Sequence, residues 1–113
     1  LAYKDSAKIT QEAIDAYARP MYEAGNRHAL VKTAEKIVPE YIHILTHEYR
    51  TIQQPVLLVW CREDRIVPLS IGQRLARELS NARLEVIETC GHVPQEEEPL
   101  ATAGLMQRFL AEK

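Results

Sequence analysis

Long apolar stretches and an excess of basic charge are both missing from this sequence. Its longest apolar run is the six residues from Val56 to Cys61, whereas a membrane-spanning helix needs about 20. The 14 Lys and Arg residues are balanced by 16 Asp and Glu residues, for a net charge of −2. We therefore expect neither a membrane span nor a nucleic-acid partner, which would call for a basic face.

Cysteine is scarce as well. Two cysteines in 113 residues are too few for a disulfide scaffold. Cys61 and Cys90 each follow a predicted strand, so a disulfide, a metal pair and a catalytic thiol all stay open. The favoured interpretation is a pair of buried, inert thiols in a reducing, cytoplasmic chain.

The start of the chain lacks the features of a signal peptide. The opening residue is Leu1, and residues 1–10 have neither a basic start nor an apolar core segment. We therefore expect a cytoplasmic chain whose beginning has been removed.

The first fifty residues have helical patterns. Apolar side chains recur at helical spacing over about residues 10–20, 27–38 and 40–50. Thr10 is a suitable N-cap, Pro20 should end the first helix, and Gly25 and Asn26 predict a break before the second. Such amphipathic helices are expected to lie on another part of the protein.

The remainder alternates strand and helix. Strands are predicted over residues 55–60 and 83–88, and helices over residues 69–79 and 99–110. The first strand is continuously apolar, which is typical of a strand buried on both faces of a parallel sheet. A strand–helix–strand unit places its two strands parallel, and two such strands are too few for a stable sheet. The pattern therefore predicts the end of a larger α/β domain.

An acid and a histidine follow these two strands. Asp64 comes shortly after the first and His92 shortly after the second, and parallel strands bring both loops to one edge of the sheet, where ligands bind. We expect the Asp64 carboxylate to accept the Nδ1–H of His92. The other ring nitrogen could then take a proton from a nucleophile or a water.

The sequence around this pair resembles the C-terminal end of the α/β-hydrolase fold family. Residues 61–68, Cys-Arg-Glu-Asp-Arg-Ile-Val-Pro, are similar to its G-x-x-D-x-x-x-P acid pattern, and residues 91–99, Gly-His-Val-Pro-Gln-Glu-Glu-Glu-Pro, to its G-H-x-x-x-x-E-x-P pattern. The resemblance implies that Asp64 is the triad acid and His92 the base. It gives Glu97 a structural role.

The resemblance also implies a fold class and a domain organisation. The fold class is α/β: the C-terminal part of an α/β-hydrolase fold, with two parallel strands and flanking helices after a helical cap segment. Residues 1–52 would be the remnant of a cap or lid with its connecting helix, and residues 53–113 the C-terminal βαβα unit.

Two departures from the family pattern stand out. Position 61 is Cys where the family usually has Gly. The nucleophile elbow G-x-S-x-G is missing, because Ser6, Ser70 and Ser80 are not framed by glycines. The chain would therefore supply two members of a triad without the third.

Metal binding is not expected. His43 and His47 have zinc-ligand spacing on a helix, but no third ligand is in register. The acidic run Glu96–Glu98 is expected to form the first turn of the last helix, where negative charge is favourable. The resemblance implies neither a metal nor an organic cofactor.

Two functions from different classes follow. The first is hydrolysis of a carboxylic ester or related bond in a small apolar acyl substrate, through a nucleophile–Asp–His triad completed by a missing N-terminal half. The second is an inactive fragment or association module that pairs its free strand edge with another chain, such as a second copy in a homodimer. A nucleotide-binding βαβ unit is disfavoured because no G-x-G-x-x-G or P-loop follows a strand.

Overall fold

The computed structural model describes residues 2–38, 40 and 47–112. They fall into two compact units. One, called here the strand unit, consists of Leu1–Lys8 with Glu48–Lys113, and the other, the helical unit, is Ile9–His47. The assignment of residues 1–52 to a cap stays a prediction.

The helical unit begins as the sequence predicts. Helix α1 covers Gln11–Ala18, and the side chain of its N-cap Thr10 accepts a hydrogen bond from the backbone N–H of Ala13. A 3₁₀ turn, η2, follows at Arg19–Tyr22 and contains Pro20. The α-helix therefore ends just before the proline, because proline has no N–H to donate to the helical hydrogen-bond ladder.

The predicted break at Gly25 and Asn26 is wrong. Helix α2 covers Ala24–Ala34 and includes both residues. The chain breaks instead at Glu23, which is extended, and the Asn26 side-chain amide donates back to the Pro20 carbonyl oxygen at 3.1 Å. Gly and Asn are tolerated here because they lie in the first turn, where the backbone N–H groups have no helical partner.

The other helix predicted in this half can be assessed only at its end. Most of residues 40–50 lie outside the described residues, and the described part ends in a 3₁₀ turn, η3, at Tyr49–Thr51. Among the described residues of the helical unit, none is buried, and large apolar side chains such as Tyr17 and Leu30 are exposed. Apolar side chains of α1 and α2 are thus exposed as far as the described part of this unit shows.

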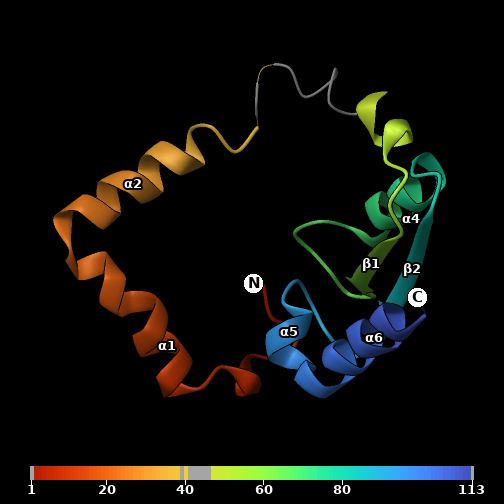
Figure 1. Cartoon of the computed structure of the whole chain (residues 1–113). Helices are drawn as coiled ribbons and strands as arrows, with labels where there is room; N and C mark the ends of the chain where they lie inside the picture. Colours follow the sequence, from red (N-terminus) through yellow and green to blue (C-terminus); the bar gives the residue numbers. More distant parts are fainter. Residues whose placement is uncertain (1, 39, 41–46, 113) are drawn as a thin grey trace. The chain divides into compact units, whose positions relative to one another are not determined.

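The strand unit contains the predicted parallel pair (Figure 1). Strand β1, Val56–Cys61, pairs in parallel with β2, Ala82–Ile87, and helix α4, Leu69–Glu78, connects them. The register runs from Val56 opposite Ala82 to Cys61 opposite Ile87. The strands, their direction and the crossover helix are all confirmed.

The last helix begins at Pro99 as predicted, but a separate helical turn precedes it. A single turn, α5, covers Pro94–Glu97, and helix α6 covers Pro99–Ala111. Between them Glu98 is extended in φ, at −137°, because a residue before proline is pushed out of the helical region. The acidic run therefore ends α5 and reaches the N-cap position of α6, without a side-chain capping hydrogen bond, and is not one continuous first turn.

The core of the strand unit is small. Its central cluster is Cys61, Ile87, Cys90 and Leu105, with Leu57 and Val59 packed against it. Leu79 is also buried. Apart from Cys61, the residues of β1 are only half-buried. The expectation of a strand buried on both faces is therefore not met by the described residues, whose sheet has two strands. Among the described helices, none combines the length and apolar character needed to cross a bilayer.

Candidate active site

Two loops leave the sheet at the carboxyl ends of β1 and β2. The acid loop, residues 62–68, follows Cys61, and the histidine loop, residues 88–93, follows Ile87. Cys61 and Ile87 are register partners, and the N–H of Arg62 still bonds the Ile87 carbonyl at 2.8 Å. The two loops therefore start side by side.

The expected contact between Asp64 and His92 is present. His92 Nδ1 lies 2.9 Å from Asp64 Oδ2, and the other carboxylate oxygen, Oδ1, accepts from the N–H groups of Ile66 and Val67 at 2.9 and 2.8 Å. The Asp64 side chain is 6% exposed and the His92 side chain 36%. One oxygen thus fixes the carboxylate to its own turn while the other holds the imidazole.

Opposing effects act on the pKa of Asp64. Burial raises it, but the hydrogen bonds from His92 and from the N–H groups of Val67 and Ile66 together outweigh burial and hold the pKa below its ordinary value. The carboxylate therefore stays ionised beside the imidazole. This is the charge state that favours an Nδ1-protonated ring.

A small cavity opens beside this pair. Its volume is about 160 Å³, and Asp64, His92, Trp60, Val67 and Pro94 are among its lining residues. The Trp60 indole Nε1–H donates to the Val67 carbonyl at 2.9 Å. This bond fixes the side of the cavity that the acid loop forms. His92 Nε2 has no hydrogen-bond partner in the part of the chain that the structure describes.

A family model with the description alpha/beta hydrolase fold matches residues 13–99. The chain belongs to this family. It is 42% identical over 93 residues to a 2-hydroxy-6-oxononadienedioate/2-hydroxy-6-oxononatrienedioate hydrolase of Burkholderia vietnamiensis, covering 80% of this chain and 32% of the relative. It is 36% identical over 77 residues to the mouse (Mus musculus) monoacylglycerol lipase ABHD6, covering 67% and 23%.

A solved structure agrees with these relatives. The meta-cleavage product hydrolase CumD superposes with a TM-score of 0.75 at 26% identity, over 96% of this chain and 41% of that one. The chain therefore spans less than half of each of these proteins, and about a third or less of the two curated relatives.

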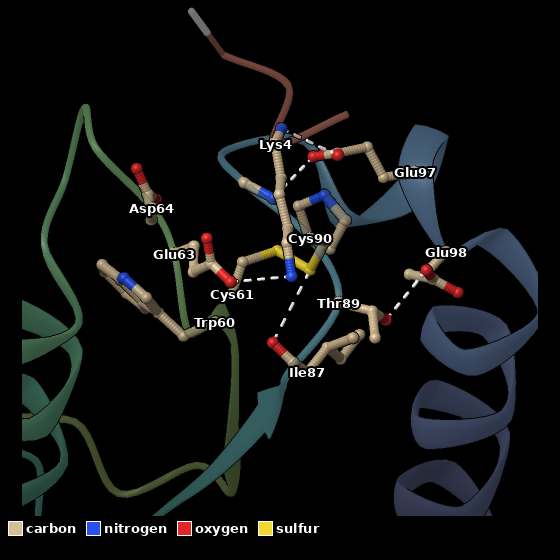
Figure 2. Close-up of a disulfide and its surroundings, with 12 residues drawn as sticks. Lys4, Trp60, Cys61, Glu63, Asp64, Ile87, Thr89, Cys90, Glu97 and Glu98 are labelled. Atoms are coloured by element: carbon tan, nitrogen blue, oxygen red, sulfur yellow. Dashed lines mark hydrogen bonds and ion pairs between the residues drawn. A yellow bond between two sulfur atoms is a disulfide. The ribbon is translucent and has the colours of Figure 1, made fainter. Parts of the chain in front are cut away.

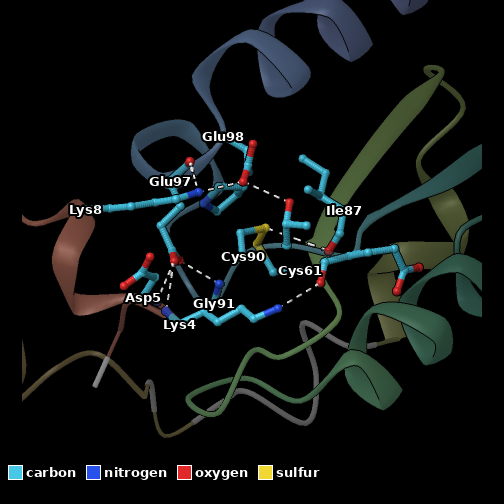
Figure 3. Close-up of polar contacts among 12 residues, drawn as sticks. Lys4, Asp5, Lys8, Cys61, Ile87, Cys90, Gly91, Glu97 and Glu98 are labelled. Carbon is cyan, nitrogen blue, oxygen red and sulfur yellow. Dashed lines mark hydrogen bonds and ion pairs between the residues drawn. A yellow bond between two sulfur atoms is a disulfide. The ribbon is translucent and has the colours of Figure 1, made fainter.

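Glu97 anchors the histidine loop of this α/β-hydrolase chain (Figure 3). Its carboxylate is 4% exposed and accepts from the N–H of Gly91 at 2.6 Å, of Lys4 at 2.9 Å and of Asp5 at 3.3 Å. The N–H of His92 in turn donates to the Ala2 carbonyl. A buried carboxylate thus ties the N-terminal segment, residues 2–8, to the loop that carries the histidine.

The sequence predicts a structural role for Glu97 but does not predict its partners. The E-x-P part of the family pattern pointed to Glu97, but its partners Lys4 and Asp5 lie more than 90 positions away in the chain. Nothing in local spacing indicates a contact over that separation.

The two cysteines are joined, so the prediction of inert thiols is wrong (Figure 2). Cys61 and Cys90 form a disulfide with a Cα–Cα distance of 5.2 Å, and the two residues are 2% and 0% exposed. Their burial was predicted correctly. Pairing follows because the register places Cys61 opposite Ile87, three residues before Cys90, within disulfide reach.

Exposed ion pairs also connect the segments around the site. Arg62 makes two hydrogen bonds of 2.7 Å to the Glu88 carboxylate, and Lys4 Nζ lies 2.7 Å from Glu63. The Arg62–Glu88 pair crosses from the acid loop to the histidine loop. Solvent screens such pairs, so each contributes little to stability.

None of the three serines is placed as a nucleophile. Ser6 begins a 3₁₀ turn, Ser70 is exposed in the first turn of α4, and Ser80 donates to the Arg50 carbonyl at 3.3 Å. None of them lines the cavity beside Asp64 and His92.

The described residues contain no group of three side chains that could hold a metal ion. His43, one half of the candidate zinc pair, lies outside the described residues, and His47 is exposed.

Proposed function

We propose that Asp64 and His92 are the acid and the base of a hydrolase triad, whose nucleophile comes from a segment outside these 113 residues. The observation that carries the proposal is the 2.9 Å contact between His92 Nδ1 and Asp64 Oδ2 at the edge of a small cavity. Family membership supports it, because nucleophile, acid and histidine follow one another in that chain order in this fold.

The geometry suits proton transfer at His92 Nε2. With Nδ1–H directed at Asp64, the second nitrogen carries a lone pair. It would take the proton of the nucleophile as that group attacks the substrate carbonyl, and return it to the leaving group. A water would then release the acyl group by the same route. Asp64 stays ionised and stabilises the imidazolium between these steps.

The substrate we propose is a carboxylic ester with a small apolar acyl group. The ABHD6 relative is named a monoacylglycerol lipase. The Burkholderia relative is named a 2-hydroxy-6-oxononadienedioate/2-hydroxy-6-oxononatrienedioate hydrolase, and CumD a meta-cleavage product hydrolase. Both reactions need a nucleophile, an oriented histidine and an acyl intermediate. The fold alone does not single out one of these reactions, because one fold hosts many. Ester hydrolysis is therefore the general reaction to test first.

The test is turnover of a chromogenic ester by the longest natural form of the protein. His92→Ala should lower kcat/KM by about 10⁴-fold or more, and Asp64→Asn by a similar factor because it favours the wrong imidazole tautomer. His28→Ala is the matched control: His28 lies in α2, in the helical unit, and its loss should change kcat/KM less than about twofold.

Turnover that survives His92→Ala would refute the triad. So would ester hydrolysis by the 113-residue chain alone at the rate of the longest form, because none of its described serines is placed to attack.

Association with another chain is a second candidate. Among the described residues β1 pairs only with β2, and an apolar groove beside it is lined by Leu57, Val59, Met106 and Phe109, among others. An open edge next to an apolar groove favours strand pairing. Light scattering of the 113-residue chain should then give a dimer mass. A monomer at all concentrations would rule out self-association.

The cytoplasmic location stays a prediction. A disulfide is more typical of oxidising compartments, so the Cys61–Cys90 bond weighs against it. Alkylation of the protein in freshly lysed cells would report whether the cysteines are free in its native compartment.

A further inference from the structure

The disulfide lies at the base of both loops that form the candidate site. Cys61 is the last residue of β1 and precedes Asp64 by three positions, while Cys90 precedes His92 by two. Figure 2 shows Asp64 in the segment that continues from Cys61. The bond therefore joins the acid loop to the histidine loop within a few residues of each reacting side chain.

Beyond this point few other contacts join the two loops. The strand ladder ends at the Arg62 N–H to Ile87 carbonyl bond. The Lys4 ammonium bridges the loops indirectly, through Glu63 and the Glu88 carbonyl oxygen. Among the described residues the later direct connections are the disulfide, the exposed Arg62–Glu88 pair and the Asp64–His92 contact itself. The disulfide is the buried and covalent one of the three.

Asp64 is oriented by its own loop, not by the histidine loop. Its Oδ1 is held by the N–H groups of Ile66 and Val67. Orientation of the carboxylate is therefore set within its own loop, whereas its separation from His92 depends on how the two loops are held together. A change of about 1 Å in that separation is enough to break a 2.9 Å hydrogen bond.

We propose that the Cys61–Cys90 disulfide is a positioning link that keeps the acid loop and the histidine loop at hydrogen-bonding distance, and that its reduction loosens the Asp64–His92 contact. Its consequence for catalysis rests on the proposed function. The link departs from the family pattern, which usually has Gly at position 61, so it is a feature of this chain.

The redox step is a thiol–disulfide exchange with a dithiol. One dithiol sulfur attacks a cysteine sulfur as a thiolate and releases the other cysteine as a thiolate. The second dithiol sulfur then displaces the protein, leaving two protein thiols and a cyclic disulfide of the reagent. Two electrons and two protons pass to the protein. Re-formation needs a small disulfide as the oxidant.

Burial makes this exchange slow in the folded protein. Both cysteines are almost fully buried, so a dithiol reaches them only when the strand unit opens locally. We expect the bond to resist reduction under native conditions and to break readily after partial opening by mild denaturant. Removal of the denaturant then leaves a folded, reduced state for measurement.

The first experiment asks whether the bond exists. Mass spectrometry after denaturation and alkylation without reductant should show no alkylated cysteine, and two after reduction. Two alkylated cysteines without reductant, in protein kept under oxidising conditions, would overturn the proposal.

The second experiment measures the Asp64–His92 contact by NMR of the histidine side chains in the 113-residue chain. Reduction, or Cys61→Ala with Cys90→Ala, should speed exchange of the His92 Nδ1 proton with water by about tenfold or more. Arg62→Gln, which removes the exposed cross-loop pair, should change that rate less than about twofold. Reductant added to the double alanine variant should do nothing further.

A third variant separates positioning from general stability. Leu105→Ala removes a buried side chain from the same core cluster while leaving the disulfide intact. If it lowers the melting temperature as much as reduction does but leaves the His92 proton slow, the link positions the pair. Equal acceleration in both, or global unfolding on reduction, would make the disulfide a stability element and overturn the proposal.

Activity gives an independent readout. In the longest form of the protein, reduction should lower kcat by a larger factor than it raises KM, because the Asp64–His92 contact acts in the chemical step. If His92→Ala fails to reduce turnover, the proposed function falls while the NMR result still decides the positioning role.

Discussion

At the scale of single residues, the Asp64–His92 contact was predictable because it depends on few assumptions. Two parallel strands bring their carboxyl ends to one edge, and each loop carries one reacting group within five residues of its strand. The disulfide was not predictable by the same reasoning. Sequence separation alone does not give the distance between two Cα atoms, and a scarce, buried cysteine is most often a free thiol.

Asp64 should make stability depend on pH in the acidic range. Its folded-state pKa lies below its ordinary value, so the folded protein binds fewer protons there than the unfolded chain. The stabilisation is present above the ordinary aspartate pKa, about 3.9, and is lost as pH falls through the folded value.

Asp64→Asn tests this dependence. The variant should be less stable than the wild type near pH 6, and the difference in unfolding free energy should shrink as pH falls below about 4. Denaturant titrations at several pH values measure it. A difference that stays constant from pH 6 to pH 3 would contradict the assigned cause.

Glu97→Gln should destabilise the strand unit and detach the N-terminal segment. The buried carboxylate accepts three backbone N–H groups, and a glutamine amide places a donor against at least one of them. We expect a loss of about 2–3 kcal/mol in unfolding free energy. Glu98→Gln is the control, because Glu98 pairs with Lys8 at the surface and its loss should cost about 1 kcal/mol or less.

At the scale of elements, the sequence predicted β1, α4, β2 and α6 well. The apolar patterns and the turn-forming residues between them indicate the same element boundaries there. It failed at α2, where Gly25 and Asn26 indicated a break that the chain makes at Glu23. The separate turn α5 was missed for a related reason. Glu98 precedes Pro99, and the restriction on a residue before proline was not weighed against the favourable acidic first turn.

Alanine substitutions at Gly91 and Gly25 compare a crowded glycine with an open one. A Cβ on Gly91 would lie 2.5 Å from the Ala2 carbonyl oxygen and 2.7 Å from the Lys4 nitrogen. Both obstacles are backbone, so Gly91→Ala should cost about 1–3 kcal/mol and push the N-terminal segment away from the histidine loop.

Gly25→Ala should do the opposite. Nothing lies within 4 Å of the added Cβ, and alanine in α2 should gain up to about 1 kcal/mol in helix stability. Thermal unfolding measures both variants. Equal effects of the two substitutions would contradict the close packing of the N-terminal segment on Gly91.

At the scale of the whole molecule, the two units differ in what holds them together. The strand unit has a buried cluster, a disulfide and a buried carboxylate anchor, whereas no described residue of the helical unit is buried. The sequence predicted helices that lie on another part of the protein and do not form a bundle of their own, which stays a prediction.

Hydrogen exchange should therefore separate the two units. In the 113-residue chain, amides of α1 and α2 should exchange much faster than those of β1 and β2, because helices of 8 and 11 residues are marginal in water without packing. Mass spectrometry of exchanged peptides measures this directly. Protection of α2 equal to that of β1 would mean that its exposed Leu30 and Val31 face is covered in solution. If that protection also faded on dilution, the cover would be a second copy of the chain, which favours association over hydrolysis as the role of the isolated 113 residues.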